Sequence, residues 1–145
     1  MAEFNACIAW ETEKRTLQLE RVQAGVAALL RDPAKGTYFL AETTRNGTPA
    51  VAGQLLITYE WSDWRNGNFW WIQSVYVAEE FRGQGIFRAL YHHVHGLAKA
   101  RKDVCGLRLY VDEHNDGARQ VYERLGLRPT NYEVLETDFV MGAER

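Results

Sequence analysis

A short turn at residues 82–85, Arg-Gly-Gln-Gly, carries the most chemical information in this sequence. It follows an apolar run at 69–77, rich in the aromatic and β-branched residues typical of strands, and leads directly into a helical pattern. Glycine lets backbone N–H groups approach a ligand closely, and the first N–H groups of a helix lack internal partners and lie at the positive end of its dipole. The arrangement therefore predicts an anion site suited to phosphate or pyrophosphate.

Two common phosphate-binding motifs do not fit this turn. A P-loop ends in Gly-Lys-Ser/Thr, which brings lysine and magnesium to the phosphates, and the turn has no such ending. A dinucleotide-binding fingerprint requires a third small residue at position 88, where arginine stands. The strands before the turn also read as an antiparallel meander rather than as part of a βαβ unit. The anion site must therefore belong to another class.

The composition fits one folded domain. The chain has 145 residues, 46% of them apolar and five of them tryptophan, enough for a substantial core. A net charge of −2 gives no indication of nucleic acid or anionic membrane as a partner. No secretory leader opens the chain and no apolar run reaches membrane-spanning length, so we expect a cytoplasmic protein.

Metal binding is not expected. His92, His93 and His95 lie close together, but no carboxylate or cysteine joins them at ligand spacing. Cys7 and Cys105 stand far apart among apolar neighbours, which indicates reduced core thiols rather than metal ligands.

The chain before the turn predicts one helix and three strands. Apolar residues at three- and four-residue spacing predict a helix over 16–31, stopped by Asp32-Pro33. Residues 1–10 have no clear pattern. Two Asn-Gly pairs indicate tight turns that join the strands into an antiparallel meander. The strands are expected at residues 36–44, 50–61 and 69–77.

The chain after the turn predicts a βαβ unit. A helix over 86–102 links strand 69–77 to a strand at 106–111, so these two strands should run parallel. A further helix, capped by Asn115 or Asp116, ends at Gly126, and a last strand is expected at 132–140. The predicted fold class is α/β, a mixed sheet in which an antiparallel meander precedes a βαβ unit, with helices on both faces.

This order of elements and two motifs resemble the GNAT superfamily of N-acetyltransferases. The family motif Gln/Arg-x-x-Gly-x-Gly/Ala lies between a strand and a helix; residues 82–87 match it at Arg82 and Gly85 and depart from it at Phe87. Residues 115–126 look like the family pattern Asn-x-x-Ala-x-x-x-Tyr-x-x-x-Gly. The resemblance covers residues 16–140. It implies a single acetyl-CoA-dependent N-acetyltransferase domain over 1–145, with the family's N-terminal strand absent or short.

The resemblance implies a site for acetyl-CoA as co-substrate, without a metal. Strands 69–77 and 106–111 would splay apart, and the pantetheine arm would pair with the backbone freed on the first of them. The turn would hold the pyrophosphate, and Asn115 would contact the arm or its neighbouring backbone, cap its helix, or do both. The expected cofactor contacts are Val75, Tyr76, Val77, Arg82, Gly83, Gln84, Gly85, Ile86, Phe87, Arg88 and Asn115.

The resemblance also implies catalytic and acceptor residues. Tyr122 aligns with the tyrosine that donates a proton to the leaving CoA thiolate, although a core aromatic would fit the same helix position. Strand 69–77 lacks the glutamate that some family members place there as a base, which leaves Glu60 as the nearest candidate for a base or a substrate contact. Carboxylates beside aromatic faces would attract a cationic amine. The expected acceptor residues are Glu11, Glu60 and Trp61, which also fit an ordinary exposed edge.

Two functions follow from this reading. The leading one is transfer of an acetyl group from acetyl-CoA to a primary amine of a small molecule or peptide, by direct attack in a ternary complex. The alternative is a non-catalytic acyl-CoA-binding or sensing domain. Tyr122 and the acidic and aromatic edge favour the enzyme, whereas Phe87 and the missing strand carboxylate keep the alternative open. The expected partners are acetyl-CoA and an amine acceptor, with neither nucleic acid nor membrane, and a homodimer is possible because dimers are common in the family.

Overall fold

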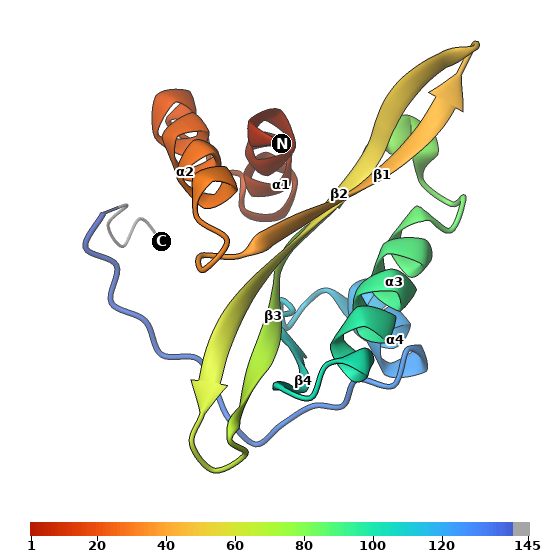
Figure 1. Cartoon of the computed structure of the whole chain (residues 1–145). Helices are drawn as coiled ribbons and strands as arrows, with labels where there is room; N and C mark the ends of the chain where they lie inside the picture. The colour runs from red at the N-terminus through yellow and green to blue at the C-terminus, as the bar shows by residue number, and fades with distance from the viewer. Residues whose placement is uncertain (141–145) are drawn as a thin grey trace. The chain divides into compact units, whose positions relative to one another are not determined.

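The computed structural model describes residues 1–140 and divides into two compact units, residues 1–110 and a second unit that begins at Val111. In the first unit, two helices precede three strands, and a short 3₁₀ turn and a third helix precede the fourth strand (Figure 1). The second unit contains one helix, α4 (Asp116–Arg124). The elements of the first unit are α1 (Ala2–Glu13), α2 (Leu19–Arg31), β1 (Thr37–Arg45), β2 (Thr48–Ser62), β3 (Gly67–Val77), η1 (Glu79–Phe81), α3 (Ile86–Ala100) and β4 (Val104–Leu109).

The four strands form one mixed sheet in the order β1-β2-β3-β4. Strands β1, β2 and β3 pair antiparallel, and β3 pairs with β4 in parallel through the α3 crossover. The first turn has Asn46 at φ 50° and Gly47 at φ 79°, the left-handed backbone that a tight hairpin requires. The predicted meander followed by a βαβ unit is confirmed.

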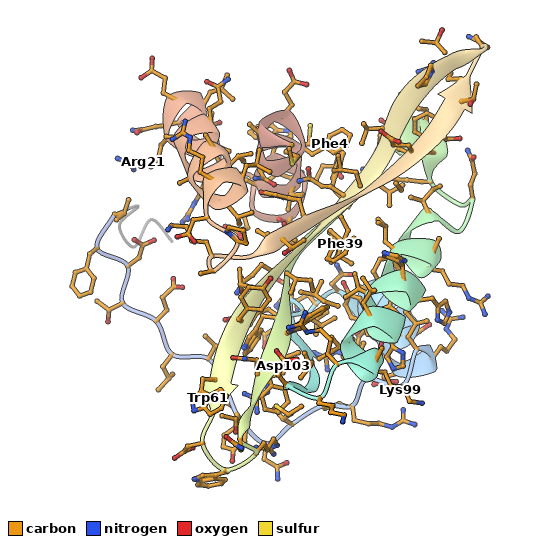
Figure 2. All side chains as sticks on the ribbon, viewed as in Figure 1. Phe4, Arg21, Phe39, Trp61, Lys99 and Asp103 are labelled. Atoms are coloured by element: carbon orange, nitrogen blue, oxygen red, sulfur yellow. The ribbon has the colours of Figure 1, made fainter. Side chains whose placement is uncertain are left out.

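Helices of the first unit cover both faces of the sheet. Helices α1 and α2 lie on one side and α3 on the other (Figure 1). Phe4 of α1 packs on Tyr76 with ring centroids 4.9 Å apart, whereas Phe39 of β1 meets His93 of α3 at 5.7 Å, so the two phenylalanines mark opposite faces (Figure 2). Leu55, Ile57 and Val94 are fully buried at the centre of the core.

A polar contact fixes α1 on the sheet. Gln54 of β2 is fully buried, and its Nε2 donates to Asn5 Oδ1 at 2.7 Å. Asn5 Nδ2 in turn donates to the Tyr38 hydroxyl at 3.0 Å. Because a buried amide without a partner is costly, these bonds determine where α1 sits on β1 and β2.

Several element bounds differ from the sequence-based prediction. Residues 2–13, mostly left unassigned from sequence, form α1, and the helix predicted over 16–31 begins at Leu19. The strand predicted at 132–140 is wrong, because these residues form neither helix nor strand. Leu135 and Phe139 are more than nine-tenths exposed. A strand needs a neighbour to satisfy its N–H and C=O groups, and an apolar pattern alone does not provide one.

No helix within residues 1–140 is both long enough and apolar enough to cross a bilayer.

Candidate functional site

Strand β3 extends beyond the end of its neighbour β4. Their pairing runs from Asn68 opposite Val104 to Ile72 opposite Leu109, where β4 ends. Strand β3 continues to Val77 and keeps its pairing with β2 on the other side. Within the part of the chain that the structure describes, the outer edge of β3 from residue 73 to 77 therefore has no partner strand. An unpaired edge of this kind can bind an extended ligand that carries amide groups.

A β-bulge lies at the point where the pairing of β3 with β4 ends. Leu56 lies opposite Ser74 and Ile57 opposite Ile72, which leaves Gln73 as the extra residue of β3. Gln73 Nε2 donates to Thr58 Oγ1 at 2.8 Å and so holds the bulge against β2. A bulge bends its strand and increases its twist, and bulges are frequent beside active sites. The bulge therefore bends β3 directly after its last pair with β4.

The free edge of β3 leads into the glycine turn. Gly83 and Gly85 have φ 75° and 78°, and Gly85 is the N-cap residue of α3. Residues 83–85 are exposed, and their backbone N–H groups have no acceptor among residues 1–140. Together with the first turn of α3, which contains Ile86, Phe87 and Arg88, they form an exposed set of donors at the positive end of a helix dipole. This is the geometry of an anion site.

The polar side chains around the turn form hydrogen bonds within the protein, so they hold the turn in place instead of adding donors for a ligand. Arg82 Nε donates to the carbonyl of Val77 at 3.0 Å, and its guanidinium pairs with Glu11 of α1 at 2.7 Å. Gln84 Nε2 donates to the carbonyl of Glu80 at 3.1 Å. Arg88 Nε donates to His92 Nε2 at 3.4 Å, one turn further along α3. Ligand binding at this turn would therefore depend mainly on its backbone.

The histidines of α3 do not form a metal centre. No group of three or more His, Cys, Asp or Glu side chains that could hold a metal ion occurs in the described residues. His92 is instead the acceptor for Arg88, and His95 stacks on Tyr91 with ring centroids 5.8 Å apart.

The expected acceptor residues lie in two places. Glu11 lies beside Arg82 at the loop end of β3. Glu60 and Trp61 pair with Phe69 and Asn68 at the opposite end. Eight residues of strand, about 26 Å, separate the two ends, so these three residues do not line one small pocket.

Glu60 belongs to a cluster on β2, β3 and β4. Its Oε1 accepts a hydrogen bond from Arg108 Nη1 at 2.8 Å, and its Oε2 accepts one from the indole N–H of Trp71. The Arg108 guanidinium lies 3.7 Å from the ring centroid of Phe69, and Trp71 packs on Tyr110 at 4.5 Å. Trp61 follows Glu60 on β2, so its side chain points to the opposite face of the sheet, where it is 59% exposed. The Glu60 carboxylate is therefore engaged by two donors.

Two predicted residues, Asn115 and Tyr122, lie in the second unit, on or beside α4. Asn115 is the N-cap of α4, and its Oδ1 accepts from the N–H of Ala118 at 3.0 Å, which confirms the predicted capping role. Tyr122 is half-buried, and burial raises the pKa of its hydroxyl above the ordinary value of 10.0. Tyr122 is therefore protonated at neutral pH.

The structure adds residues that sequence analysis did not identify. Arg108, Trp71 and Phe69 surround Glu60, and Gln73 forms the bulge. Arg108 carries a sequence signal, because it is the only charged residue in the apolar run 104–109. The bulge at Gln73 has no comparable signal.

Comparison with known proteins supports the family that the glycine turn and residues 115–126 resemble. The sequence profile of the Acetyltransferase (GNAT) family matches residues 3–127. A possible acetyltransferase from Clostridium difficile 630 of known structure is 41% identical, with a TM-score of 0.85 over 96% of this chain and 89% of that one. A mycothiol acetyltransferase from Corynebacterium aurimucosum is 32% identical over 84% of this chain and 40% of its own length.

A thialysine N-ε-acetyltransferase from Bos taurus is 35% identical over 54% of this chain and 45% of its own length. The chain thus spans less than half the length of the two curated relatives. The family profile, in contrast, extends over most of the chain and over both the glycine turn and α4. The chain belongs to the GNAT family of acetyltransferases.

Proposed function

We propose that this protein transfers an acetyl group from acetyl-CoA to a primary amine of a small molecule or peptide. The observation that carries the proposal is the free edge of β3 over residues 73–77, which leads into a turn whose N–H groups at residues 83–85 are open. An extended chain with amide groups that ends in a diphosphate matches this arrangement. Acetyl-CoA has that chemistry.

In the proposed complex, the pantetheine amides pair with the backbone of Val75, Tyr76 and Val77 as an added strand. The pyrophosphate accepts hydrogen bonds from the turn and from the first residues of α3. The match of residues 115–126 to the family pattern supports Asn115 as a further contact of the arm, through its side-chain NH₂ because its Oδ1 accepts from Ala118. Family membership supports acetyl-CoA as the co-substrate, and the family match across both units supports one N-acetyltransferase domain.

The proposed reaction is a direct acyl transfer in a ternary complex. The neutral amine nitrogen attacks the thioester carbonyl, a C–N bond forms and a tetrahedral intermediate results. The C–S bond then breaks, and the CoA thiolate takes the proton of the Tyr122 hydroxyl. Burial raises the pKa of Tyr122, which keeps this proton available at neutral pH. The phenolate is reprotonated from solvent, and the nitrogen gives up its proton to water or to the Glu60 carboxylate.

The names of two relatives support an amino group as the acceptor class. The Bos taurus relative is named for N-ε-acetylation of thialysine, and the Corynebacterium relative is named for acetylation connected with mycothiol. The Glu60 cluster, with the rings of Trp71 and Phe69 beside it, supplies the carboxylate and aromatic groups proposed to contact a cationic amine.

The proposal is tested by following thiol release from acetyl-CoA with a panel of amines, amino acids, aminoglycosides and peptides. Tyr122→Phe removes the proposed acid and retains the ring. Tyr132→Phe is the matched control, because Tyr132 lies in the same unit and is 79% exposed. We expect amine-dependent release that falls about 10²- to 10⁴-fold in Tyr122→Phe and is unchanged in Tyr132→Phe.

Two other outcomes of this assay would change the proposal. Release that is equal in Tyr122→Phe and the parent chain rules out Tyr122 as the acid and leaves the transferase intact. Tight binding of acetyl-CoA without release on any acceptor contradicts the transferase and supports the sensing domain.

A further inference from the structure

Glu11, near the end of α1, holds two side chains of the candidate cofactor region. Its Oε2 accepts from Arg82 Nη2 at 2.7 Å, and its Oε1 accepts from the same nitrogen at 3.0 Å. The Oε1 atom also accepts from the Tyr76 hydroxyl at 3.1 Å. One carboxylate of α1 thus joins the end of β3 to the first residue of the glycine turn.

Arg82 is held from a second direction as well. Its Nε donates to the carbonyl of Val77 at 3.0 Å, and its guanidinium carbon lies 5.5 Å from the ring centroid of Tyr76. The guanidinium therefore has a fixed orientation against both α1 and the end of β3. Arginine suits this role because its planar fork donates in several directions at once.

Both partners of Glu11 keep their protons at neutral pH. Partial burial works against the charged form of Arg82, but the hydrogen bond and charge of Glu11 outweigh it, and the pKa of Arg82 is raised. Burial, followed by contacts with Cys7 and Glu11, raises the pKa of Tyr76.

The turn itself has few other attachments. Gly83 and Gly85 have positive φ, and neither carries a side chain that could hold the backbone. The backbone N–H of Arg82 donates to the carbonyl of Glu79 at 3.2 Å, and the Gly85 carbonyl accepts from Ala89 in α3 at 2.9 Å. Between these points the Gln84 side chain donates to the carbonyl of Glu80 at 3.1 Å, so the direction of the N–H groups depends on where Arg82 and Gln84 are held.

We propose that Glu11 is a positioning residue for the cofactor turn, acting through Arg82 rather than through the acceptor amine. The proposal rests on the proposed function and deepens it, because it assigns α1 a part in acetyl-CoA binding. It also gives Arg82, the first residue of the glycine motif, a side-chain role that is separate from phosphate contact. Loss of Glu11 releases the guanidinium and lets the turn sample orientations that do not bind the diphosphate.

The test measures the Kd of CoA by calorimetry for the parent chain, Glu11→Gln and Glu13→Gln. Glu13 is the matched control because it lies on the same helix, is exposed and loses the same charge. Its Oε2 lies 3.9 Å from Nη1 of Arg15, which does not belong to the turn. We expect the Kd to rise about three- to tenfold in Glu11→Gln, equivalent to about 0.7–1.4 kcal/mol, and to stay unchanged in Glu13→Gln. Exposed ion pairs contribute little to stability, so Glu11→Gln should shift the melting temperature by only about 2 °C.

A double-mutant cycle with Arg82→Lys shows whether Glu11 acts through Arg82. We expect Arg82→Lys to weaken CoA binding and Glu11→Gln to add nothing to it, because the two changes disrupt one contact. Additive losses contradict the proposal. A Kd for CoA that is unchanged in Glu11→Gln also contradicts it, whether or not the KM of the acceptor rises. Failure of the parent chain to bind CoA contradicts the proposed function itself.

Discussion

Ile72 of β3 lies opposite Leu109 of β4, and this is the last pair that the two strands share. The next residue of β3, Gln73, is the extra residue of a bulge. Directly after the Ile72–Leu109 pair, β3 therefore continues without a neighbour on that side. The backbone edge left free there is the proposed binding site for the pantetheine arm. The same edge ends shortly before the turn that would hold the diphosphate, since β3 ends at Val77 and Arg82 precedes Gly83.

Deletion of Gln73 should remove this bulge without unfolding the sheet. The pairs Leu56–Ser74 and Ile57–Ile72 would then follow each other directly, as in a regular ladder. We expect a folded chain whose affinity for acetyl-CoA is at least about tenfold lower, because the free edge of β3 would lose the bend and twist that the bulge gives it. Calorimetry and circular dichroism measure the two effects. A folded deletion variant with full affinity contradicts the role given to the bulge.

Gly85→Ala should weaken acetyl-CoA binding through the backbone alone. A Cβ at position 85 would meet nothing within 4 Å, so its effect comes from φ 78°, which costs a non-glycine residue about 1–2 kcal/mol. We expect the Kd for acetyl-CoA to rise by about tenfold as the N–H groups turn away.

Gly96→Ala provides the control for this substitution. Gly96 lies within α3 and is exposed, and a Cβ added at this position would also meet nothing within 4 Å. There alanine should stabilise the helix by about 0.5–1 kcal/mol and leave the Kd unchanged. Equal affinities for Gly85→Ala and the parent chain would show that the turn does not need its left-handed backbone.

The meander and the βαβ unit could be predicted because their signals are local. Asn-Gly pairs specify tight turns, and an apolar strand followed by an amphipathic helix specifies a parallel crossover. The strand predicted at 132–140 failed because strand formation depends on a partner, which the apolar residues Tyr132, Val134 and Phe139 do not encode. Helix α1 was missed because its position depends on Asn5 and Phe4 meeting the sheet rather than on a strong pattern.

Some parts of the candidate site could likewise be predicted from local motifs, whereas others could not. The glycine turn and the cap at Asn115 could be predicted from short motifs. The contact between Glu11 and Arg82 joins residues 71 positions apart, and that between Glu60 and Arg108 joins residues 48 apart. Pairings over such distances depend on strand register and helix packing, which no local pattern specifies.

Alkaline pH should destabilise the protein through its tyrosines. Burial raises the pKa of Tyr76, Tyr91 and Tyr122 above their ordinary value of 10.0. Above that value the unfolded chain loses phenolic protons that the folded chain retains, so the free energy of unfolding falls as pH rises towards the folded pKa values. Stability from these groups is fully present below about pH 10 and is lost above it.

Urea unfolding between about pH 9 and about pH 11.5 measures this loss. Tyr91 is the most buried of the three and is 3% exposed. It should contribute a slope of at most about 1.4 kcal/mol per pH unit, and Tyr91→Phe should remove that contribution. A free energy of unfolding that stays constant or rises over this range contradicts the prediction.

The most direct test of the proposed function follows the acetyl group itself. The protein is incubated with acetyl-CoA that carries a ¹³C-labelled acetyl group and with the acceptor panel, and mass spectrometry measures the acceptor, free CoA and the intact protein. Direct attack in a ternary complex predicts a labelled amide on the acceptor, an equal amount of free CoA and an unlabelled protein. Label retained on the protein would contradict direct attack. Protein that binds acetyl-CoA and labels no acceptor would contradict the transferase.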